Sequence, residues 1–301
     1  LIIGVALGAI SALVLDAPVG APVRRLPVVG ALGLRAGIYL LVIGGGLQLG
    51  ETLGTAMHFS IRTDSDSMPN FFFALAAAVI ISIAQTLRRV IGPGLLPLLA
   101  GRYRRPHEEE RAVLFIDLRG STSIAERLGN KRFVQFLDEV IFAATEPIVE
   151  AGGEIYRYVG DEIIATWPIR GHSIDPVCVR CALMIIRAVE ARHAYFERKY
   201  SLVPRFRIGL HAGPIVVSEL GDVKREIVML GDVMNTAARI TSFCRDSTQN
   251  YLTSSSVISR LKLPADLQAK SIGNVSLRGK TEGLELFAIE WALHSPSDSA
   301  P

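Results

Sequence analysis

The chain has 301 residues, half of which are hydrophobic, and its mean hydropathy of +0.35 is high for a soluble domain and predicts membrane segments. Residues 1–105 contain nine Arg, no Lys and four acidic residues, whereas residues 106–301 contain 23 basic and 25 acidic residues. This balance excludes a broad basic face for nucleic acid in the second part, and three cysteines are too few for a disulfide framework.

The first part of the chain predicts an α-helical transmembrane region, residues 1–90, with about three spans. Nearly continuous apolar stretches cover residues 1–15, 34–57 and 71–90. The first stretch is either the end of a spanning helix or the core of a signal peptide, and we favour the helix because no basic leader or cleavage motif accompanies it. The first residue is Leu1, so we expect the numbering to begin inside a longer protein.

The charges beside these stretches predict the orientation of the region. Arginines follow the first stretch and end the third, whereas the loop between the second and third contains Asp64 and Asp66. Positively charged loops stay in the cytoplasm, so we expect a multi-pass protein of the inner (plasma) membrane with a cytoplasmic C-terminal part. Residues 91–105 form a juxtamembrane linker, which either transmits motion or only connects the two parts. Its basic RYRR run favours contact with anionic membrane lipid.

Between residues 106 and 291 the pattern changes to alternating short strands and helices, and residues 292–301 follow as a tail. This order predicts an α+β domain with a ferredoxin-like sheet. One hairpin is expected to turn across Ala212–Pro214. The expected strands cover residues 112–118, 155–159, 163–167, 206–211, 215–218 and 227–230, and the expected helices cover residues 122–150 and 175–199.

Two aspartates stand at positions that suit a metal site. Asp117 ends an apolar strand, and Asp161 lies in the tight turn of an expected hairpin. Carboxylates are the ligands that Mg²⁺ and Mn²⁺ prefer when phosphates supply further oxygens. Each aspartate alone is equally well explained as a turn residue that makes local hydrogen bonds.

Downstream, Asn235 and Arg239 are four residues apart and share one face of an expected helix. An arginine there neutralises phosphate charge, and an asparagine hydrogen-bonds a sugar or an attacking oxygen. The alternative for either residue is an ordinary solvated helix face.

Four sequence blocks in this order resemble the catalytic domain of the class III nucleotidyl cyclases. The blocks are FIDLRGST (115–122), YVGDE (158–162), NTAAR (235–239) and LRGK (277–280). The resemblance covers residues 106–291 and implies the conversion of ATP to 3′,5′-cyclic AMP and pyrophosphate, with two Mg²⁺ or Mn²⁺ ions per active site. It also implies a homodimer with two equivalent sites, in which one chain provides the aspartates and the other the asparagine and arginine.

The resemblance assigns roles residue by residue. Asp117, Asp161 and the backbone carbonyl of Leu118 match the metal ligands, while Asn235 and Arg239 match the residues that orient the ribose and stabilise the transition state. Arg278 matches the family's triphosphate-binding lysine, with Lys280 two residues further on, and Arg157 and Val228 stand at the base-reading positions. Apart from the resemblance, we expect the backbone amides of Gly120, Ser121 and Thr122 to bind phosphate at the start of the following helix.

The base-reading positions depart from the best-known pattern of the family and leave the purine open. Arg157 donates hydrogen bonds to adenine N1 or to guanine O6, and Val228 offers no acceptor for an amino group. We expect ATP to be preferred, with GTP and a guanylate cyclase as the alternative. A membrane receptor with a non-catalytic, cyclase-like dimerisation domain is a further alternative, which the intact set of aspartates, asparagine and arginine disfavours.

The remaining reactive side chains predict no second chemistry. Cys178 and Cys181 lie on an expected helix, and together with Cys244 they are expected to be packed thiols rather than a redox or zinc site, because zinc needs four ligands. His211 is expected to close its strand beside a turn.

Overall fold

The computed structural model describes residues 103–245, 247–280 and 282–292, together with residue 101 and six helical residues of the N-terminal part (30, 33, 37, 76, 80 and 83). The chain divides into two compact units, Leu1–Leu96 and Pro97–Pro301. Apart from those six residues, the three expected membrane spans lie outside the described residues. Within the described part, no helix combines the length and the apolar composition that a membrane span needs.

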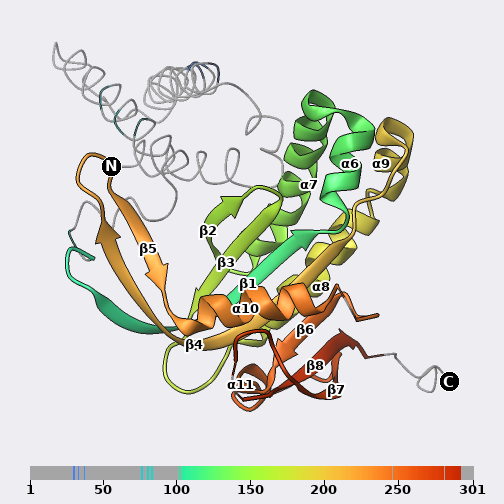
Figure 1. The fold of residues 1–301 in the computed structure, drawn as a ribbon. Coiled ribbons are helices and arrows are strands. Elements are labelled where there is room, and N and C mark those ends of the chain that lie inside the picture. Colours follow the sequence, from blue (N-terminus) through green and yellow to red (C-terminus); the bar gives the residue numbers. More distant parts are fainter. Residues whose placement is uncertain are drawn as a thin grey trace, which may run out of the picture. The chain divides into compact units, whose positions relative to one another are not determined.

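A mixed sheet of eight strands lies at the centre of the second unit (Figure 1). Its strands are β1 (His107–Leu118), β2 (Glu154–Val159), β3 (Glu162–Pro168), β4 (Phe206–Leu220), β5 (Glu226–Leu230), β6 (Tyr251–Ser254), β7 (Leu267–Val275) and β8 (Leu284–Trp291). The helices are α6 (Ser121–Leu128), α7 (Asn130–Glu150), α8 (Pro176–Glu190), α9 (His193–Tyr200), α10 (Asp232–Phe243) and α11 (Ser255–Ile258).

The strand order is β2-β3-β1-β4-β6-β8-β7, and β5 pairs with β4 beside this path. All pairs are antiparallel except β4 with β6. Helices α6 and α7 connect β1 to β2, and α8 and α9 connect β3 to β4. The first four strands therefore form two interleaved split β-α-β units, and the predicted α+β class is confirmed.

The predicted hairpin across residues 212–214 is wrong, because β4 continues without a turn from Phe206 to Leu220. Gly213 and Pro214 stay in register with Arg111 and Glu110 of β1. On its other side, β4 pairs with β6 only up to Leu210 and with β5 only from Val216. The missing N–H of the proline therefore interrupts no second ladder among the described strands. The real hairpin lies further on, between β4 and β5.

The predicted single helix over residues 175–199 is also wrong, since it breaks after Glu190 into α8 and α9. No Gly or Pro marks this break in the sequence. The reason is tertiary: Phe196 and Tyr200 of α9 pack edge-on against Phe136 of α7, at ring-centroid distances of 5.8 and 5.1 Å. Such aromatic contacts outweigh a few residues of helix propensity.

The sheet is covered on both faces, and β1 shows how. Leu114 and Ile116 belong to a large core cluster with α7 and α8, whereas Val113 and Phe115 belong to a second cluster with β5 and α10. Alternate side chains of a strand point to opposite faces, and Figure 1 shows α10 crossing one face of the sheet. Asp117 continues the row of Val113 and Phe115, so its carboxylate projects on the same face as α10.

Helix α10 packs closely on β4 because residue 209 has no side chain. A Cβ atom on Gly209 would lie 2.6 Å from the backbone nitrogen of Thr241 and 2.7 Å from the carbonyl oxygen of Ala237. Any side chain here would push α10 away from the sheet. Because α10 carries Asn235 and Arg239, this glycine sets how close those residues lie to the sheet.

We expect Gly209→Ala to lower the free energy of unfolding by about 2 kcal/mol, since overpacking of a close contact typically costs ~1–3 kcal/mol. The matched control is Gly213→Ala on the same strand, where the added Cβ would come no closer than 3.7 Å to Val233. Urea unfolding of both variants provides the comparison. Equal stability of the two variants would contradict this account of the packing between α10 and β4.

Candidate active site

Three carboxylates lie close together where β1 ends. Asp117 pairs in register with Glu162, the first residue of β3, and Asp161 precedes Glu162 in the turn from β2. Gly160 adopts a φ of 62°, a left-handed conformation that favours glycine and lets the chain reverse here. The structure thus brings together the two aspartates that the sequence singled out, and adds a glutamate.

Burial and the charges of neighbouring carboxylates both raise the pKa values of Asp117 and Glu162. Burial raises the pKa of Asp117; the positive charge of Arg207 opposes this shift, and the charge of Asp161 adds to it. Burial, followed by the charges of Asp117 and Asp161, raises the pKa of Glu162 to about 7. Crowded carboxylates of this kind are stabilised by any cation placed between them.

This donor set fits a hard divalent cation. The Oδ2 atom of Asp161 is buried and has no hydrogen-bond partner among the described residues, so it is free to act as a ligand. In the described part of the chain, no group of three or more His, Cys, Asp or Glu side chains is arranged to hold a metal. Mg²⁺ needs only one or two carboxylates when water and substrate phosphates complete its shell. The side chain of Leu118 contains no ligand atom, so this residue can offer only its backbone carbonyl.

Arg207 is a site residue that the sequence analysis missed. It stands opposite Asp117 in the β1–β4 ladder, and its Nη2 atom lies 3.1 Å from Oδ2 of Asp117. The residue is only 8% exposed, and its Nε has no partner among the described residues. Its guanidinium thus places a positive charge beside the carboxylate of Asp117. The contact of Arg207 with Asp117 is seen only in the structure, because the pairing of β1 with β4 brings together residues that lie 90 positions apart in the sequence.

The predicted phosphate-binding positions lie at the start of α6. Gly120 precedes the helix with a φ of 69°, and no side chain caps the first turn. The amide groups of Ser121 and Thr122 therefore belong to an uncapped helix N-terminus, which favours anions. This turn directly follows β1, so it lies next to Asp117 along the chain.

The second predicted group of residues lies on the outer face of α10. Asn235 is exposed and Arg239 is half-buried, whereas Val233, Ala237 and Ile240 on the other side of the helix are buried. The periodicity of the helix therefore turns Asn235 and Arg239 away from the core. Among the described side chains, no hydrogen bond or ion pair links them to the aspartates of the same chain.

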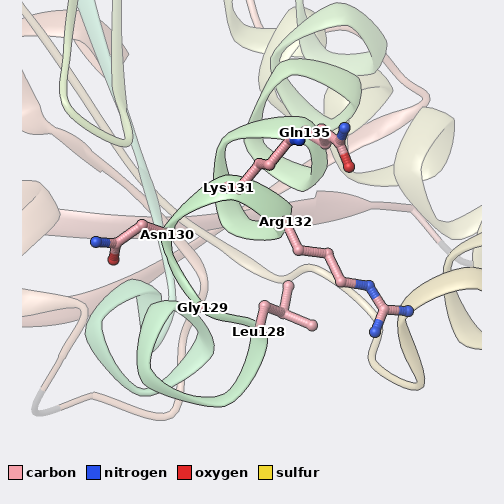
Figure 2. Close-up of a pocket in the computed structure, with 6 residues that line it drawn as sticks. All are labelled: Leu128, Gly129, Asn130, Lys131, Arg132 and Gln135. Atoms are coloured by element: carbon pink, nitrogen blue, oxygen red, sulfur yellow. The ribbon is translucent and has the colours of Figure 1, made fainter.

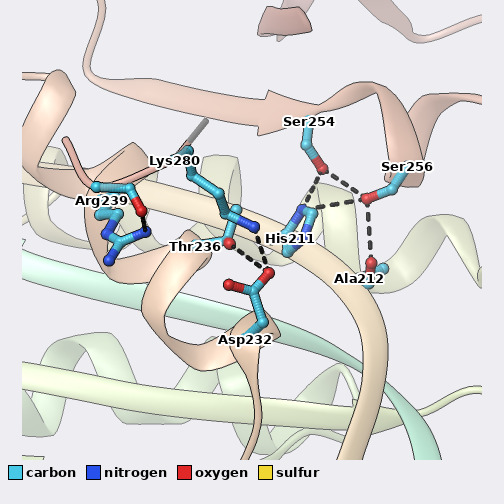
Figure 3. Close-up of polar contacts among 9 residues, drawn as sticks. His211, Ala212, Asp232, Thr236, Arg239, Ser254, Ser256 and Lys280 are labelled. Atoms are coloured by element: carbon cyan, nitrogen blue, oxygen red, sulfur yellow. Dashed lines mark hydrogen bonds and ion pairs between the residues drawn. The ribbon is translucent and has the colours of Figure 1, made fainter. Parts of the chain in front are cut away.

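The turn between β7 and β8 carries the other predicted cations, and Figure 3 shows one of them, Lys280. Arg278 is exposed, and Lys280 forms an ion pair with Asp232 at the start of α10. Nη1 of Arg239 donates a hydrogen bond to the carbonyl oxygen of Gly279, 3.3 Å away. The structure thus places Arg239 and Lys280 together, although 41 residues separate them in the chain.

The predicted base-reading positions also come near each other. Arg157 of β2 donates to Oε2 of Glu226 at 2.7 Å, and Glu226 and Val228 project from the same side of β5 because they are two residues apart. Next to them, the amide of Met229 donates to the hydroxyl of Tyr156 at 3.0 Å. Glu226, which the sequence analysis did not identify, adds an acceptor that Val228 lacks.

A surface depression of about 410 Å³ lies elsewhere, at the corner between α6 and α7 (Figure 2). None of the predicted site residues lines it. Its walls are formed by Leu128, Gly129, Asn130, Lys131, Arg132 and Gln135. The guanidinium of Arg132 is already engaged, because Nη2 donates to the carbonyl oxygen of Lys199 at 2.6 Å. We therefore assign no role to this depression.

The cysteines are packed thiols, as predicted. All three are buried and free, and burial raises the pKa of Cys178 and of Cys244 to about 12. Thiols in this state are neutral and unreactive at neutral pH. Cys181 is equally buried, and its Sγ donates to the carbonyl oxygen of Pro147.

His211 lies inside the continuous strand β4 rather than at a strand end. Its Nδ1 atom is 2.7 Å from Oγ of Ser254 and 3.1 Å from Oγ of Ser256 (Figure 3). Burial lowers the pKa of His211 to about 4; the charge of Lys280 adds to the shift and that of Asp232 opposes it. The folded protein therefore keeps this imidazole neutral well below pH 6.

This shift predicts a loss of stability in mild acid. The unfolded chain protonates His211 below about pH 6.5, whereas the folded chain does so only near pH 4, so the stability present above pH 6.5 falls as the pH decreases. Between pH 7 and pH 5, we expect the wild type to lose about 2 kcal/mol more than His211→Asn. Urea unfolding at both pH values measures this difference, and parallel losses in the two proteins would contradict the buried neutral histidine.

Comparison with known proteins agrees with this geometry. The family described as "Adenylate and Guanylate cyclase catalytic domain" matches residues 104–290. "Adenylate cyclase 2" of Rhizobium meliloti (strain 1021) is 37% identical over 231 residues, which are 76% of this chain and 64% of that protein. "Adenylate cyclase" of Anabaena cylindrica is 28% identical over 188 residues, or 59% of this chain and 36% of that protein. The chain thus spans less than two thirds of either relative.

Among solved structures, a bacterial light-regulated adenylyl cyclase superimposes with a TM-score of 0.61 at 19% identity, covering 76% of this chain and 67% of that one. At this level of identity the likeness shows a shared fold. The family match covers more than half of the chain, and it shows that this chain belongs to the adenylate and guanylate cyclase catalytic domain family.

Proposed function

We propose that the protein is an adenylate cyclase that converts ATP to 3′,5′-cyclic AMP and pyrophosphate. The observation that carries this proposal is that one chain retains both halves of a site. Asp117 and Asp161 form a crowded carboxylate pair beside Arg207, and α10 presents Asn235 and Arg239 on its outer face. The two relatives described as adenylate cyclases support ATP as the nucleotide.

In this reaction the ribose 3′-oxygen attacks the α-phosphorus, and pyrophosphate leaves. Two Mg²⁺ or Mn²⁺ ions held by Asp117 and Asp161 would lower the pKa of the attacking hydroxyl and neutralise the leaving group. The guanidinium of Arg207 adds a permanent positive charge beside the carboxylates. The amides of Ser121 and Thr122, at the start of α6, hold phosphate oxygens.

The residues of α10 act on the reacting centre from the other side. Arg239 neutralises the charge that develops on the α-phosphate, and its guanidinium reaches two oxygens at once. Asn235 donates to or accepts from the ribose and so fixes the direction of attack. Lys280 and the exposed Arg278 bind the β- and γ-phosphates, while Arg157 and Val228 contact the base.

The arrangement supports a homodimer with two shared sites. Asn235 faces outward, and no described hydrogen bond or ion pair joins it or Arg239 to the aspartates of their own chain. A pair that faces outward can form a complete site with the aspartates of a second copy of the chain. Two copies related by a twofold axis would then form two equivalent sites.

We further propose that residues 1–90 anchor the enzyme in the inner membrane, that the RYRR run of the linker contacts anionic lipid, and that the catalytic domain is cytoplasmic. The support is the sequence pattern alone: three apolar stretches and the arginines at their ends. Separation of membranes from the soluble fraction after expression of the full chain tests this placement.

The activity itself is tested by incubating the full chain with Mn²⁺ and either ATP or GTP, and by measuring cyclic nucleotide formation. Arg157 and Glu226 offer one donor and one acceptor, and both purines can use such a pair. We therefore expect ATP to be preferred by only ~10 to 100-fold. A preference for GTP would identify a guanylate cyclase, and a folded dimer inactive with both nucleotides would support the non-catalytic alternative.

A further inference from the structure

We propose that Asp232 and Gly279 are positioning residues, which hold Lys280 and Arg239 in the places from which these two cations act on the substrate. This proposal rests on the proposed cyclase activity. It concerns the turn Leu277–Lys280, which contacts α10 at three points. Figure 3 shows the two polar contacts.

The first point is the ion pair between Asp232 and Lys280 at the start of α10. Asp232 is itself oriented, because the hydroxyl of Thr236 one helical turn later donates to Oδ2 at 3.2 Å. The bond from Lys280 holds the pKa of Asp232 below its usual range. The carboxylate also suits the positive end of the helix dipole. Asp232 thus remains charged and fixes the direction of the lysine.

The second point is the hydrogen bond from Nη1 of Arg239 to the carbonyl oxygen of Gly279. Gly279 adopts a φ of +74°, and a Cβ atom on it would lie 3.2 Å from Nη2 of Arg239. Another residue here would strain the backbone, and its Cβ atom would require the guanidinium to move by a few tenths of an ångström. A side chain at residue 279 would displace Arg239 directly.

The third point is apolar. Leu277 is 3% exposed and belongs to a small core cluster with Ile240 and Cys244 from the end of α10 and its cap. The amide of Lys280 donates to the carbonyl oxygen of Leu277 at 3.0 Å and closes the turn. Leu277 therefore anchors the turn in the core. The two polar contacts of the turn lie seven residues, or two helical turns, apart along α10.

These contacts leave both cations able to bind phosphate. Arg239 uses one of five N–H donors on Gly279, and Lys280 uses one of three on Asp232. A side chain that is already ordered in the free enzyme loses less conformational entropy when the substrate binds or reacts. The two contacts should then affect different kinetic constants, because Lys280 binds the triphosphate in the ground state and Arg239 stabilises the transition state.

The experiment compares Gly279→Ala with Gly273→Ala in the full chain. Gly273 also has a positive φ, +94°, but nothing lies within 4 Å of an added Cβ, so both variants carry backbone strain and only one displaces Arg239. We expect Gly279→Ala to lower kcat about 10 to 100-fold with KM for ATP within about twofold, since small misplacements of a catalytic group cost this much. Gly273→Ala should keep the kcat of the wild type, and both should lower Tm by similar amounts.

The second arm is Asp232→Asn, which keeps the shape of the side chain and loses its charge. We expect KM for ATP to rise about threefold to fivefold with little change in kcat, and Asp232→Glu to restore most of the affinity. An unchanged or lower KM in Asp232→Asn, or equal kcat in the two glycine variants, would overturn the proposal. A wild-type protein without turnover on ATP or GTP would instead refute the proposed function, so the two failures are distinguishable.

Discussion

Asp161→Asn is expected to abolish cyclic AMP formation, by at least ~10³-fold, while leaving the protein at least as stable as the wild type. Activity is lost because a neutral amide holds a divalent cation far less strongly than a carboxylate. Stability is retained because Asp161 repels Asp117 and Glu162, and because its buried Oδ2 has no partner among the described residues. Without metal, we expect the free energy of unfolding to rise by about 1 kcal/mol.

The measurements are Mn²⁺-dependent turnover of ATP and urea unfolding in the presence of a chelator. Asp138→Asn, an exposed carboxylate of α7, serves as the control and should change neither quantity. Asp117→Asn should also be inactive but less stable, since it leaves the buried guanidinium of Arg207 without its carboxylate. Turnover near that of the wild type in Asp161→Asn would refute the metal-binding role of this residue.

Two inactive chains are expected to restore each other's activity. When Asp161→Asn and Arg239→Ala chains are mixed in equal amounts, half of the dimers contain one chain of each kind. Each mixed dimer has one intact site and one site that lacks both residues, so the mixture should regain about one quarter of the wild-type rate. The physical basis is the outward direction of Arg239 on α10, away from the core of its own chain.

The control for this experiment mixes Asp161→Asn with Asp117→Asn, which lie in the same half of the site. No shared site is then complete, and no activity should return. The formation of mixed dimers is verified by two different affinity tags on the two chains. Mixed dimers that remain inactive with Asp161→Asn and Arg239→Ala would show that each chain completes its own site.

The amino-acid sequence alone determined the α+β class of the domain and identified the candidate residues of its site. Strand β1 can be predicted because a continuous apolar run ends in Asp117. The turn at Gly160–Asp161 can be predicted because glycine readily adopts the backbone conformation that a chain reversal needs. Local signals of this kind depend on neighbours within a few residues. They also placed Asn235 and Arg239 on one helix face, which the structure shows directed outward.

Only the tertiary structure decided the features that depend on contacts between distant segments. Strand β4 continues through Gly213 and Pro214 because β1 pairs with it there, although the dipeptide alone predicts a turn. Arg207 reaches Asp117 through the same ladder, and the break between α8 and α9 follows the packing of aromatic rings on Phe136.

The contact of Lys280 with Asp232 likewise joins residues 48 positions apart. Spacing and composition specify local conformation, whereas the energy that overrides them comes from burial and ion pairing between segments that the sequence keeps far apart.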